Sequence, residues 1–323
     1  MEPALQLRGI SKTFGETIAV QDMDLEVPPG ALYGFIGPNG AGKTTCIRMV
    51  MSILFPDRGE MSVLGRASAL EAKDRIGYLP EERGVYRKMR VGAFLTYMGR
   101  LKGLTSSEAS ARGRQLLERV RLPETLDRRC EDLSKGMLQR VQIAAAIMHR
   151  PDLLILDEPF SGLDPVSVRL LRDLIAEEHR RGTTILFSTH VMAHAEELCQ
   201  HVVMIHRGRK VLDEATAALR RRFDTRRILF EPLAAEANVD VVRTLDGVVA
   251  LQRDDTGYEV TLAGDGDAPA VMRQIAALLP VARLELARLR LDDIFIGLVS
   301  AGDAADAALR ENLRGLQAEG VTA

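Results

Sequence analysis

The sequence predicts an α/β fold built on a mixed, largely parallel sheet and followed by a second, smaller α+β domain. Residues 31–36 form an apolar segment that leads into a glycine-rich loop, and residues 153–156 form another that ends in two carboxylates. Unbroken apolar runs of this length suit strands buried on both faces of a parallel sheet. After residue 211 the pattern changes to short strand-like and helix-like segments, which predicts a separate domain.

The glycine-rich loop reads GPNGAGKT over residues 37–44, and a helical pattern follows over residues 45–54. Small residues let successive backbone N–H groups point inward, and the positive end of the following helix favours an anion. Lys43 can reach the β- and γ-phosphates of a nucleotide, and the Thr44 hydroxyl is placed to bind Mg²⁺. The sequence therefore predicts a P-loop site for the phosphates of a nucleotide, formed by Gly37, Pro38, Asn39, Gly40, Ala41, Gly42, Lys43, Thr44 and Thr45.

The second apolar run ends in Asp157, Glu158 and Pro159. At the carboxyl end of a buried strand, Asp157 is positioned to hold Mg²⁺ directly or through water. Hydrolysis also needs an acceptor aimed at the attacking water, and we expect Glu158 to have that role. Taken alone, the same tripeptide would be read as a helix cap or a turn. Its pairing with the upstream phosphate loop favours the catalytic interpretation.

A third segment, LSKGM, begins at Leu133 and precedes a helical pattern that runs to about residue 148. Here the chain resembles the nucleotide-binding subunits of ABC (ATP-binding cassette) ATPases, whose signature is LSGGQ. Other elements of that family follow in order: Phe14 where an aromatic ring stacks on adenine, SGLD ending at Asp164, and a histidine, His190, after a strand over residues 184–189. The resemblance covers roughly residues 4–215 and implies a P-loop NTPase core of the ABC type, with a helical subdomain at about residues 85–150.

The resemblance also implies a mechanism. Ser134 and Gly136 lie at a helix N-terminus, which is an anion-binding position, and in the family they face the γ-phosphate of a second subunit. ATP would then hold two chains together head to tail, and its hydrolysis would release them. His190 would contact the γ-phosphate. The expected activity is a Mg²⁺-dependent ATPase coupled to transport, and the expected partners are a second copy of this chain and a transmembrane permease on another chain.

The chain departs from the family pattern at two places. Glu81 stands where most members have the glutamine that senses Mg²⁺ and the attacking water, so it is a further candidate metal ligand beside Thr44 and Asp157. Lys135 and Met137 replace residues of the signature, and methionine cannot hydrogen-bond a ribose. PEERGVY together with LSKGM resembles one branch of the family, the nucleotide-binding subunits of bacterial drug and sodium-type exporters, which carry a similar C-terminal extension.

Composition and charge suit a chain that works at a membrane without entering it. The formal net charge is −2, which gives no general attraction to nucleic acid or to an anionic bilayer. No run approaches the roughly 20 apolar residues that a transmembrane helix needs. We therefore expect a cytoplasmic protein held at the inner face of the plasma membrane through its permease. Its cysteines lack CxxC spacing, and we expect alkylation of Cys46, close to the phosphate loop, to block nucleotide binding sterically.

The expected domains are the nucleotide-binding domain over residues 1–215, a basic linker over 216–227, a small α+β domain of ferredoxin-like character over 228–299, and a tail over 300–323. The arginine-rich linker contains a single aromatic residue, Phe223, and the net charge of the chain is slightly negative, which disfavours a nucleic-acid partner. The tail is expected either to form a short helix or to fray.

The site where the membrane partner docks is expected near residues 77–90. Its basic residues, which could pair with partner carboxylates or form a solvated cluster, are Arg83, Arg87, Lys88 and Arg90.

Two other functions remain open at the level of sequence. One is a soluble cassette ATPase of repair, translation or cofactor assembly, and the other is a regulatory subunit whose catalysis has decayed. The lack of a long coiled-coil insertion and of a second cassette disfavours the first. Retention of Lys43, Glu158 and His190 disfavours the second. The sequence does not identify the transported substrate.

Overall fold

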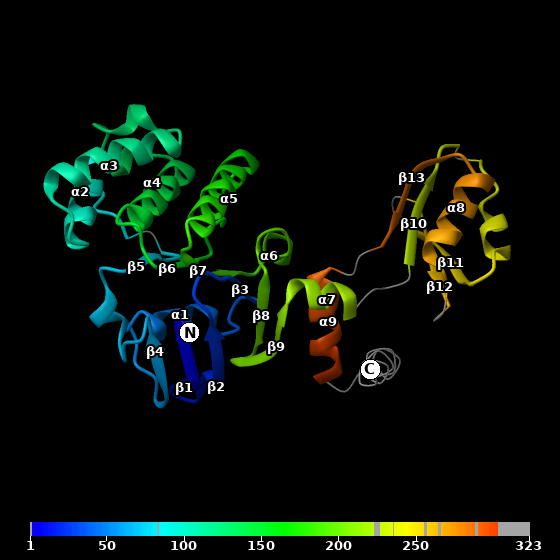
Figure 1. Cartoon of the computed structure of the whole chain (residues 1–323), viewed down its shortest axis with the longest axis horizontal. Helices are drawn as coiled ribbons and strands as arrows, with labels where there is room; N and C mark the ends of the chain where they lie inside the picture. The colour runs from blue at the N-terminus through cyan, green and yellow to red at the C-terminus, as the bar shows by residue number, and fades with distance from the viewer. Residues whose placement is uncertain are drawn as a thin grey trace. The chain divides into compact units, whose positions relative to one another are not determined.

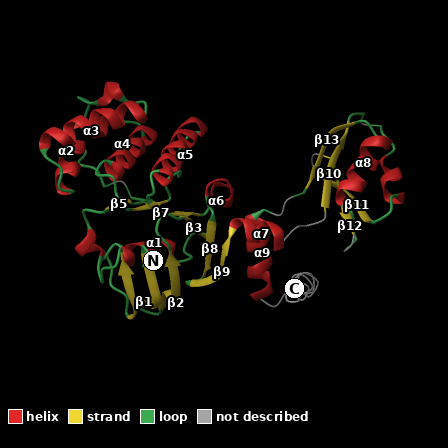
Figure 2. Ribbon diagram, viewed as in Figure 1, coloured by secondary structure: helices red, strands yellow, loops and turns green. Residues whose placement is uncertain are grey.

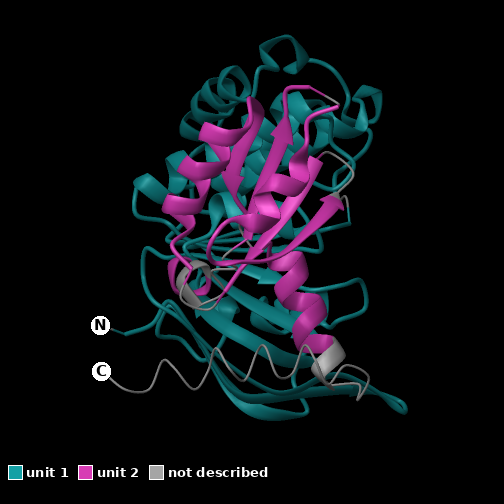
Figure 3. Ribbon diagram, turned by 90° about the vertical axis from the view of Figure 1, so that its right-hand side faces the viewer, with its two compact units in different colours: residues 1–216 teal, residues 217–323 magenta. Residues whose placement is uncertain are grey.

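The computed structural model describes residues 2–82, 84–222, 227–234, 236–254, 257–263, 266–287 and 290–302. The chain divides into two compact units, Met1–Thr216 and Ala217–Ala323, which are coloured separately in Figure 3. Four sequence predictions fall partly or wholly outside the described residues. They concern Arg83, the end of the basic linker at 223–226, the α+β domain at 235, 255–256, 264–265 and 288–289, and the tail from residue 303.

The first unit is built on a six-stranded mixed sheet in the order β5-β6-β7-β3-β8-β9. Five strands run parallel and β9 pairs antiparallel with β8. Every residue of β3, β6 and β7 is buried, as expected for strands covered on both faces. The strands are β3 (Leu32–Ile36), β5 (Ile76–Leu79), β6 (Leu153–Asp157), β7 (Thr184–Thr189), β8 (His201–His206) and β9 (Arg209–Ala215).

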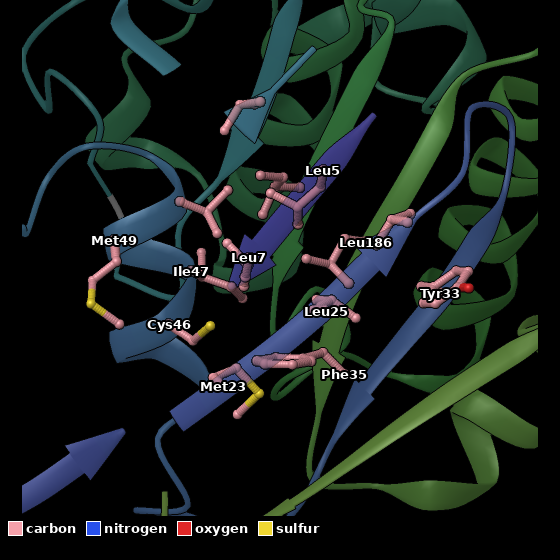
Figure 4. Packing of buried hydrophobic residues seen from close by; sticks show 14 of the residues in the cluster. Leu5, Leu7, Met23, Leu25, Tyr33, Phe35, Cys46, Ile47, Met49 and Leu186 are labelled. Atoms are coloured by element: carbon pink, nitrogen blue, oxygen red, sulfur yellow. The ribbon is translucent and has the colours of Figure 1, made fainter. Parts of the chain in front are cut away.

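A three-stranded antiparallel sheet in the order β2-β1-β4 packs beside this mixed sheet. Its strands are β1 (Leu5–Phe14), β2 (Thr17–Val27) and β4 (Arg58–Val63). A turn at Gly15 joins the first two, and Gly15 has a φ of 58°, in the region that favours glycine. Alternate apolar side chains of β1 and β2 meet helix α1 in the core shown in Figure 4, which contains Leu7, Met23 and Ile47.

Helices complete the first unit (Figures 1 and 2). They are α1 (Lys43–Val50), α2 (Val91–Leu101), α3 (Ser106–Arg119), α4 (Lys135–Ile147), α5 (Pro165–Arg180) and α6 (Met192–Leu198). Helix α1 ends earlier than the predicted limit at residue 54, because Ser52 has a left-handed φ of 55° that a helix cannot contain. Helices α2, α3 and α4 pack together within the predicted helical subdomain.

The start of α3 shows how sequence sets a helix boundary in this subdomain. The Thr105 side chain accepts a hydrogen bond from the Glu108 N–H, and the Glu108 carboxylate accepts one from the Thr105 N–H. This reciprocal capping box satisfies two backbone donors that would otherwise lack partners. No helix in the described part of the chain is both long and apolar enough to cross a bilayer.

The second unit contains a four-stranded antiparallel sheet in the order β11-β12-β10-β13. Its elements are α7 (Thr216–Arg222), β10 (Arg227–Pro232), the 3-10 helix η4 (Val239–Thr244), β11 (Val248–Asp254), β12 (Gly257–Leu262), α8 (Ala268–Leu278), β13 (Val281–Leu286) and α9 (Leu291–Gly302). From β10 to β13 this order and pairing are those of the predicted ferredoxin-like fold. Part of the predicted basic linker is helical, since residues 216–222 form α7.

Candidate functional site

The phosphate loop joins the end of β3 to the start of α1. Gly37 and Gly42 have positive φ angles of 156° and 107°. A Cβ on Gly37 would lie 2.2 Å from the Ile205 carbonyl oxygen, and one on Gly42 would lie 2.3 Å from that of Ala19. Both positions therefore require glycine. No side chain caps the N-terminus of α1, so its first N–H groups are left for an anion.

Lys43 lies inside the curve of this loop with only 5% of its surface exposed. Its Nζ donates to the carbonyl oxygens of Gly37 at 2.7 Å and Pro38 at 3.1 Å. The same atom is 3.6 Å from Glu158 Oε1. Burial lowers the pKa of Lys43, and the nearby carboxylates, led by Glu158, oppose that shift. The Lys43 ammonium is thus held between the phosphate loop and Glu158, which follows the end of β6.

Asp157 ends β6 as a fully buried carboxylate. Ser188 Oγ donates to Asp157 Oδ1 at 2.5 Å, and Thr44 Oγ1 lies 3.3 Å from the same oxygen. The other oxygen, Oδ2, has no hydrogen-bond partner within the described residues. Burial raises the pKa of Asp157, and the bonds from Ser188 and Thr44 oppose this effect.

The residues around Asp157 fit a bound Mg²⁺. A hard cation prefers oxygen ligands, and an unpaired buried carboxylate oxygen is such a ligand. Thr44 Oγ1 also lies 3.4 Å from Glu81 Oε2, so the hydroxyl lies between two carboxylates. The described residues contain no group of three or more His, Cys, Asp or Glu side chains able to hold a metal by themselves. Phosphate and water oxygens would therefore have to complete the coordination, as is usual for Mg²⁺ with a nucleotide.

Glu158 follows β6 in an unusual backbone conformation, with a φ of 49°. Its N–H contacts both the carbonyl oxygen and the hydroxyl of Ser188, at 3.2 Å and 3.1 Å. Its side chain is 7% exposed, and Oε1 lies 3.0 Å from His190 Nδ1. Left-handed conformations of non-glycine residues are costly and cluster at functional sites. Adjacent strands β6 and β7 thus bring Glu158 and His190 together.

The signature segment lies at the start of α4, which packs with α2 and α3 rather than with α1 (Figure 1). The exposed Ser134 caps this helix by accepting a hydrogen bond from the Met137 N–H at 3.3 Å. Gly136 neighbours the loop before α5, where a Cβ on Gly136 would lie 3.9 Å from Asp164 Oδ2. Asp164 in turn caps α5 by accepting from the Ser167 N–H at 3.0 Å.

Sequence-predicted site residues therefore fall into two groups. The structure brings together Lys43, Thr44, Glu81, Asp157, Glu158 and His190 through contacts between neighbouring side chains. Ser134, Gly136 and Asp164 form a second group beside α4 and α5. Phe14 ends β1 with 48% of its surface exposed, and the Lys12 ammonium lies 5.6 Å from its ring centre. An exposed ring flanked by a cation is available for stacking on a base.

Sequence reasoning missed Ser188 and Gln139. Ser188 contacts both Asp157 and the Glu158 N–H, and the polar end of the otherwise apolar β7 was the available signal. Gln139, buried in α4, donates from Nε2 to the Pro159 carbonyl oxygen at 3.2 Å. It thereby connects the signature helix to the turn that holds Glu158. A buried amide on a helix gives no sequence signal of its partner.

The structure corrects the expectation for Cys46. This thiol is 2% exposed and packs against the antiparallel sheet in the core shown in Figure 4. Burial raises its pKa to about 12. Because the thiolate is the reacting form, we expect Cys46 to resist alkylation in the folded protein, which removes the accessible thiol that steric blocking of the site requires.

Comparison with known proteins matches the ABC transporter family at residues 20–161, and the C-terminal domain of DrrA1-3-like ATP-binding proteins at residues 216–299. The chain is 35% identical over 297 residues to an uncharacterized ABC transporter ATP-binding protein, YhaQ of Bacillus subtilis, covering 92% of this chain and 99% of that one. It is 41% identical over 205 residues to the ABC transporter ATP-binding protein NatA of Bacillus subtilis, covering 62% and 83%.

A third relative is the Nod factor export ATP-binding protein I of Cupriavidus metallidurans, 39% identical over 216 residues that cover 66% of this chain and 71% of that one. Among solved structures, an ATP-binding subunit of an ABC transporter superposes with a TM-score of 0.63 and 32% identity, covering 68% of this chain and 93% of that one. The similarity to YhaQ spans nearly the whole of both chains. The chain belongs to the ABC transporter family as an ATP-binding subunit with a DrrA-like C-terminal domain.

Proposed function

We propose that this chain is the ATP-hydrolysing motor of a membrane exporter, working with ATP and Mg²⁺. One observation carries the proposal. The Glu158 carboxylate lies 3.0 Å from His190 and 3.6 Å from Lys43, next to the unpaired oxygen of Asp157. A proton acceptor (Glu158), an ammonium group (Lys43) and a candidate metal ligand (Asp157) thus lie together beside the phosphate loop. This combination suits attack of water on a terminal phosphate.

Each residue has a distinct part in the proposed reaction. The loop N–H groups and Lys43 hold the β- and γ-phosphates, and Phe14 stacks on the adenine. Glu158 orients the attacking water and accepts its proton, while His190 contacts the γ-phosphate and steadies Glu158. Thr44, Asp157 and Glu81 are the proposed ligands of Mg²⁺. When bound, that ion neutralises charge that develops on the phosphate oxygens.

The active assembly is proposed to contain two copies of the chain. Ser134 is exposed at the N-terminus of α4, a helix that packs with α2 and α3 rather than with α1, the helix that follows the phosphate loop. A helix start of this kind favours an anion, so Ser134, Gly136 and Asp164 are proposed to contact the nucleotide held by the partner copy. ATP would close the homodimer and hydrolysis would open it.

We further propose that the dimer drives a permease on another chain and is held by it at the inner face of the plasma membrane. The name of one relative, the Nod factor export ATP-binding protein I, supports the direction of transport. The name of another, the ABC transporter ATP-binding protein NatA, supports the type of complex. A soluble cassette ATPase that is not coupled to transport is the alternative. No specific contact in the structure favours it.

Sedimentation velocity of the full chain tests the catalytic and dimeric parts of this proposal. Glu158→Gln keeps the shape of the site but removes the proton acceptor, so turnover should fall about 10²- to 10⁴-fold while ATP and Mg²⁺ produce a stable dimer. Lys43→Ala should neither bind ATP nor dimerise. Ser134→Arg should bind ATP as a monomer. Wild-type turnover by Glu158→Gln, or an ATP-dependent dimer of Ser134→Arg, would contradict the assignments.

A pull-down from detergent-solubilised membranes tests the coupling to transport. The tagged Glu158→Gln protein should retain a multi-span protein in the presence of ATP and Mg²⁺, and Lys43→Ala should not. Recovery of a soluble complex instead would favour the alternative.

A further inference from the structure

Gln139 is a buried polar side chain that has no part in the proposed reaction. It lies in α4 with 4% of its surface exposed, and its Nε2 donates to the Pro159 carbonyl oxygen at 3.2 Å. A carbonyl oxygen can only accept, so the contact requires the nitrogen end of the amide. Pro159 directly follows Glu158, the proposed proton acceptor, in a segment that we call the catalytic turn, residues 158–164. The hydrogen bond therefore holds the backbone one residue away from Glu158.

The same face of α4 contacts the rest of the catalytic turn. A Cβ on Gly136 would lie 3.5 Å from Leu163 Cδ2, and one on Gly162 would lie 2.5 Å from Lys135 Nζ. Positions three and four residues apart lie on one face of a helix, so Lys135, Gly136 and Gln139 form a single contact surface. Figure 1 shows α4 beside α5, the helix into which the catalytic turn leads.

The catalytic turn has little freedom to absorb a displacement. Glu158 has a left-handed φ of 49°, and its N–H is held by Ser188 on β7. Within the turn, the Ser161 N–H donates to the Glu158 carbonyl oxygen at 3.1 Å, and the Leu163 N–H donates to that of Phe160 at 3.3 Å. A backbone in such a costly conformation persists only because its surroundings impose it. Movement of the neighbouring carbonyl group would therefore be transmitted to the Glu158 side chain.

The other end of this connection is the signature segment. Ser134 is the N-cap of α4 and lies five residues before Gln139, which is about 7.5 Å along the helix axis. Rigid helices and hydrogen bonds are the elements that carry energetic coupling between sites. In the proposed dimer, Ser134 contacts the nucleotide of the partner copy, whereas Glu158 acts on the nucleotide of its own copy. The first turns of α4 thus connect the two nucleotide sites.

We propose that Gln139 is a positioning residue that couples the two nucleotide sites of the dimer. When the partner's ATP engages Ser134, α4 sets the Pro159 carbonyl through Gln139 and so aligns Glu158 with the attacking water. This rests on the proposed function, because it needs two copies arranged head to tail. Its consequence is that ATP in one site promotes hydrolysis in the other, and that this dependence is lost without the Gln139 amide.

Steady-state turnover of the full chain as a function of ATP concentration, at saturating Mg²⁺, tests this proposal. Wild type should show a Hill coefficient above one, with two as the upper limit for two sites. Gln139→Met keeps the length of the side chain but removes the donor, so it should lower kcat about 3- to 30-fold and bring the Hill coefficient to one. Affinity for a non-hydrolysable ATP analogue, measured on the monomeric Ser134→Arg background, should not change.

The matched control is a second buried glutamine on the same helix. Gln142 is 6% exposed, and its Oε1 atom has no hydrogen-bond partner within the described residues. Gln142→Met should keep the kcat and the Hill coefficient of wild type. Gln139→His places a ring N–H the same number of bonds from Cα as the glutamine Nε2, and it should recover part of both quantities. The melting temperature of each variant shows whether it is folded at the assay temperature.

A purely structural Gln139 would lower the melting temperature of Gln139→Met but leave its kcat and Hill coefficient as in wild type, and this result would overturn the proposal. So would a wild-type Hill coefficient of one, or an equal loss in Gln142→Met. Gln139→Glu repeats the test at unchanged side-chain volume, because an ionised carboxylate cannot donate to the Pro159 carbonyl, and it carries the test if Gln139→Met does not fold. Absence of ATP turnover in wild type would refute the proposed function and this inference with it, whereas cooperative turnover that survives in the Gln139 variants would refute only the inference.

Discussion

Replacing Asp157 by asparagine should stabilise the nucleotide-free protein while removing its response to Mg²⁺. The carboxylate is fully buried, and its Oδ2 atom has no partner among the described residues. A buried acceptor atom that is left without a partner costs about 1–3 kcal/mol, and more when its group is charged. Asparagine has nearly the same shape, keeps an oxygen for the Ser188 hydroxyl, and carries no charge. We expect a gain of about 1–2 kcal/mol in the free energy of unfolding.

Differential scanning calorimetry measures this gain. For a unit that spans Met1–Thr216, each kcal/mol corresponds to about 2–4 °C, so the melting temperature should rise by about 2–8 °C. Wild-type protein should gain about 2.7 kcal/mol when a Mg²⁺ complex of a non-hydrolysable ATP analogue is present at about 100 times its dissociation constant. The variant should gain much less, and addition of EDTA should make little difference to it.

The pH dependence of the free energy of unfolding tests the same prediction independently. Burial raises the pKa of Asp157 above its value in the unfolded chain, so the folded state binds more protons between the two pKa values. The stability that Asp157 contributes therefore falls as the pH rises from the unfolded pKa to the folded pKa, and the full cost of burying the charged carboxylate applies above the folded pKa. The gain in stability from Asp157→Asn should shrink as the pH is lowered from the folded pKa to the unfolded pKa. A variant that melts below the wild type in nucleotide-free buffer at neutral pH would refute this reasoning.

Three further outcomes are expected. Ser188→Ala removes the hydroxyl that contacts Asp157 and the Glu158 N–H, so it should lower the free energy of unfolding by about 1.5–3 kcal/mol and weaken Mg²⁺-dependent nucleotide binding. An unchanged denaturant midpoint and an unchanged nucleotide affinity would show that the contact is incidental. Cys46 should resist maleimide in the folded protein and react in denaturant, and fast labelling of the native chain would contradict its burial. Burial lowers the pKa of His149 from 6.5 to about 4, so the stability that this residue contributes is lost as the pH falls between these values. In urea unfolding, His149→Gln should make the free energy of unfolding depend less on pH in that range. A pH dependence that runs parallel to that of the wild type would refute the assignment.

Local residue chemistry was sufficient to predict the parts of the site that depend on backbone shape and chain order. GPNGAGKT requires a loop that only glycine can follow at Gly37 and Gly42, and it precedes a helix wherever it functions. The run ending at Asp157 suits a strand that is buried on both faces, and β6 is such a strand. The order of the segments similarly predicted the ferredoxin-like character of the second unit.

The tertiary structure decided the contacts between segments that are distant in sequence. Ser188 contacts Asp157 because β6 and β7 are neighbours in the sheet, and the sequence of neither strand predicts which strand lies beside it. Burial of Cys46 and the left-handed backbone of Glu158 depend on what packs around them. Arg100 and Arg114 line one hollow because α2 and α3 pack together, although both residues look like ordinary solvated charges in sequence. Sequence fixes which groups a chain can offer, whereas packing determines which of them meet, because each long-range contact is selected by the fold as a whole.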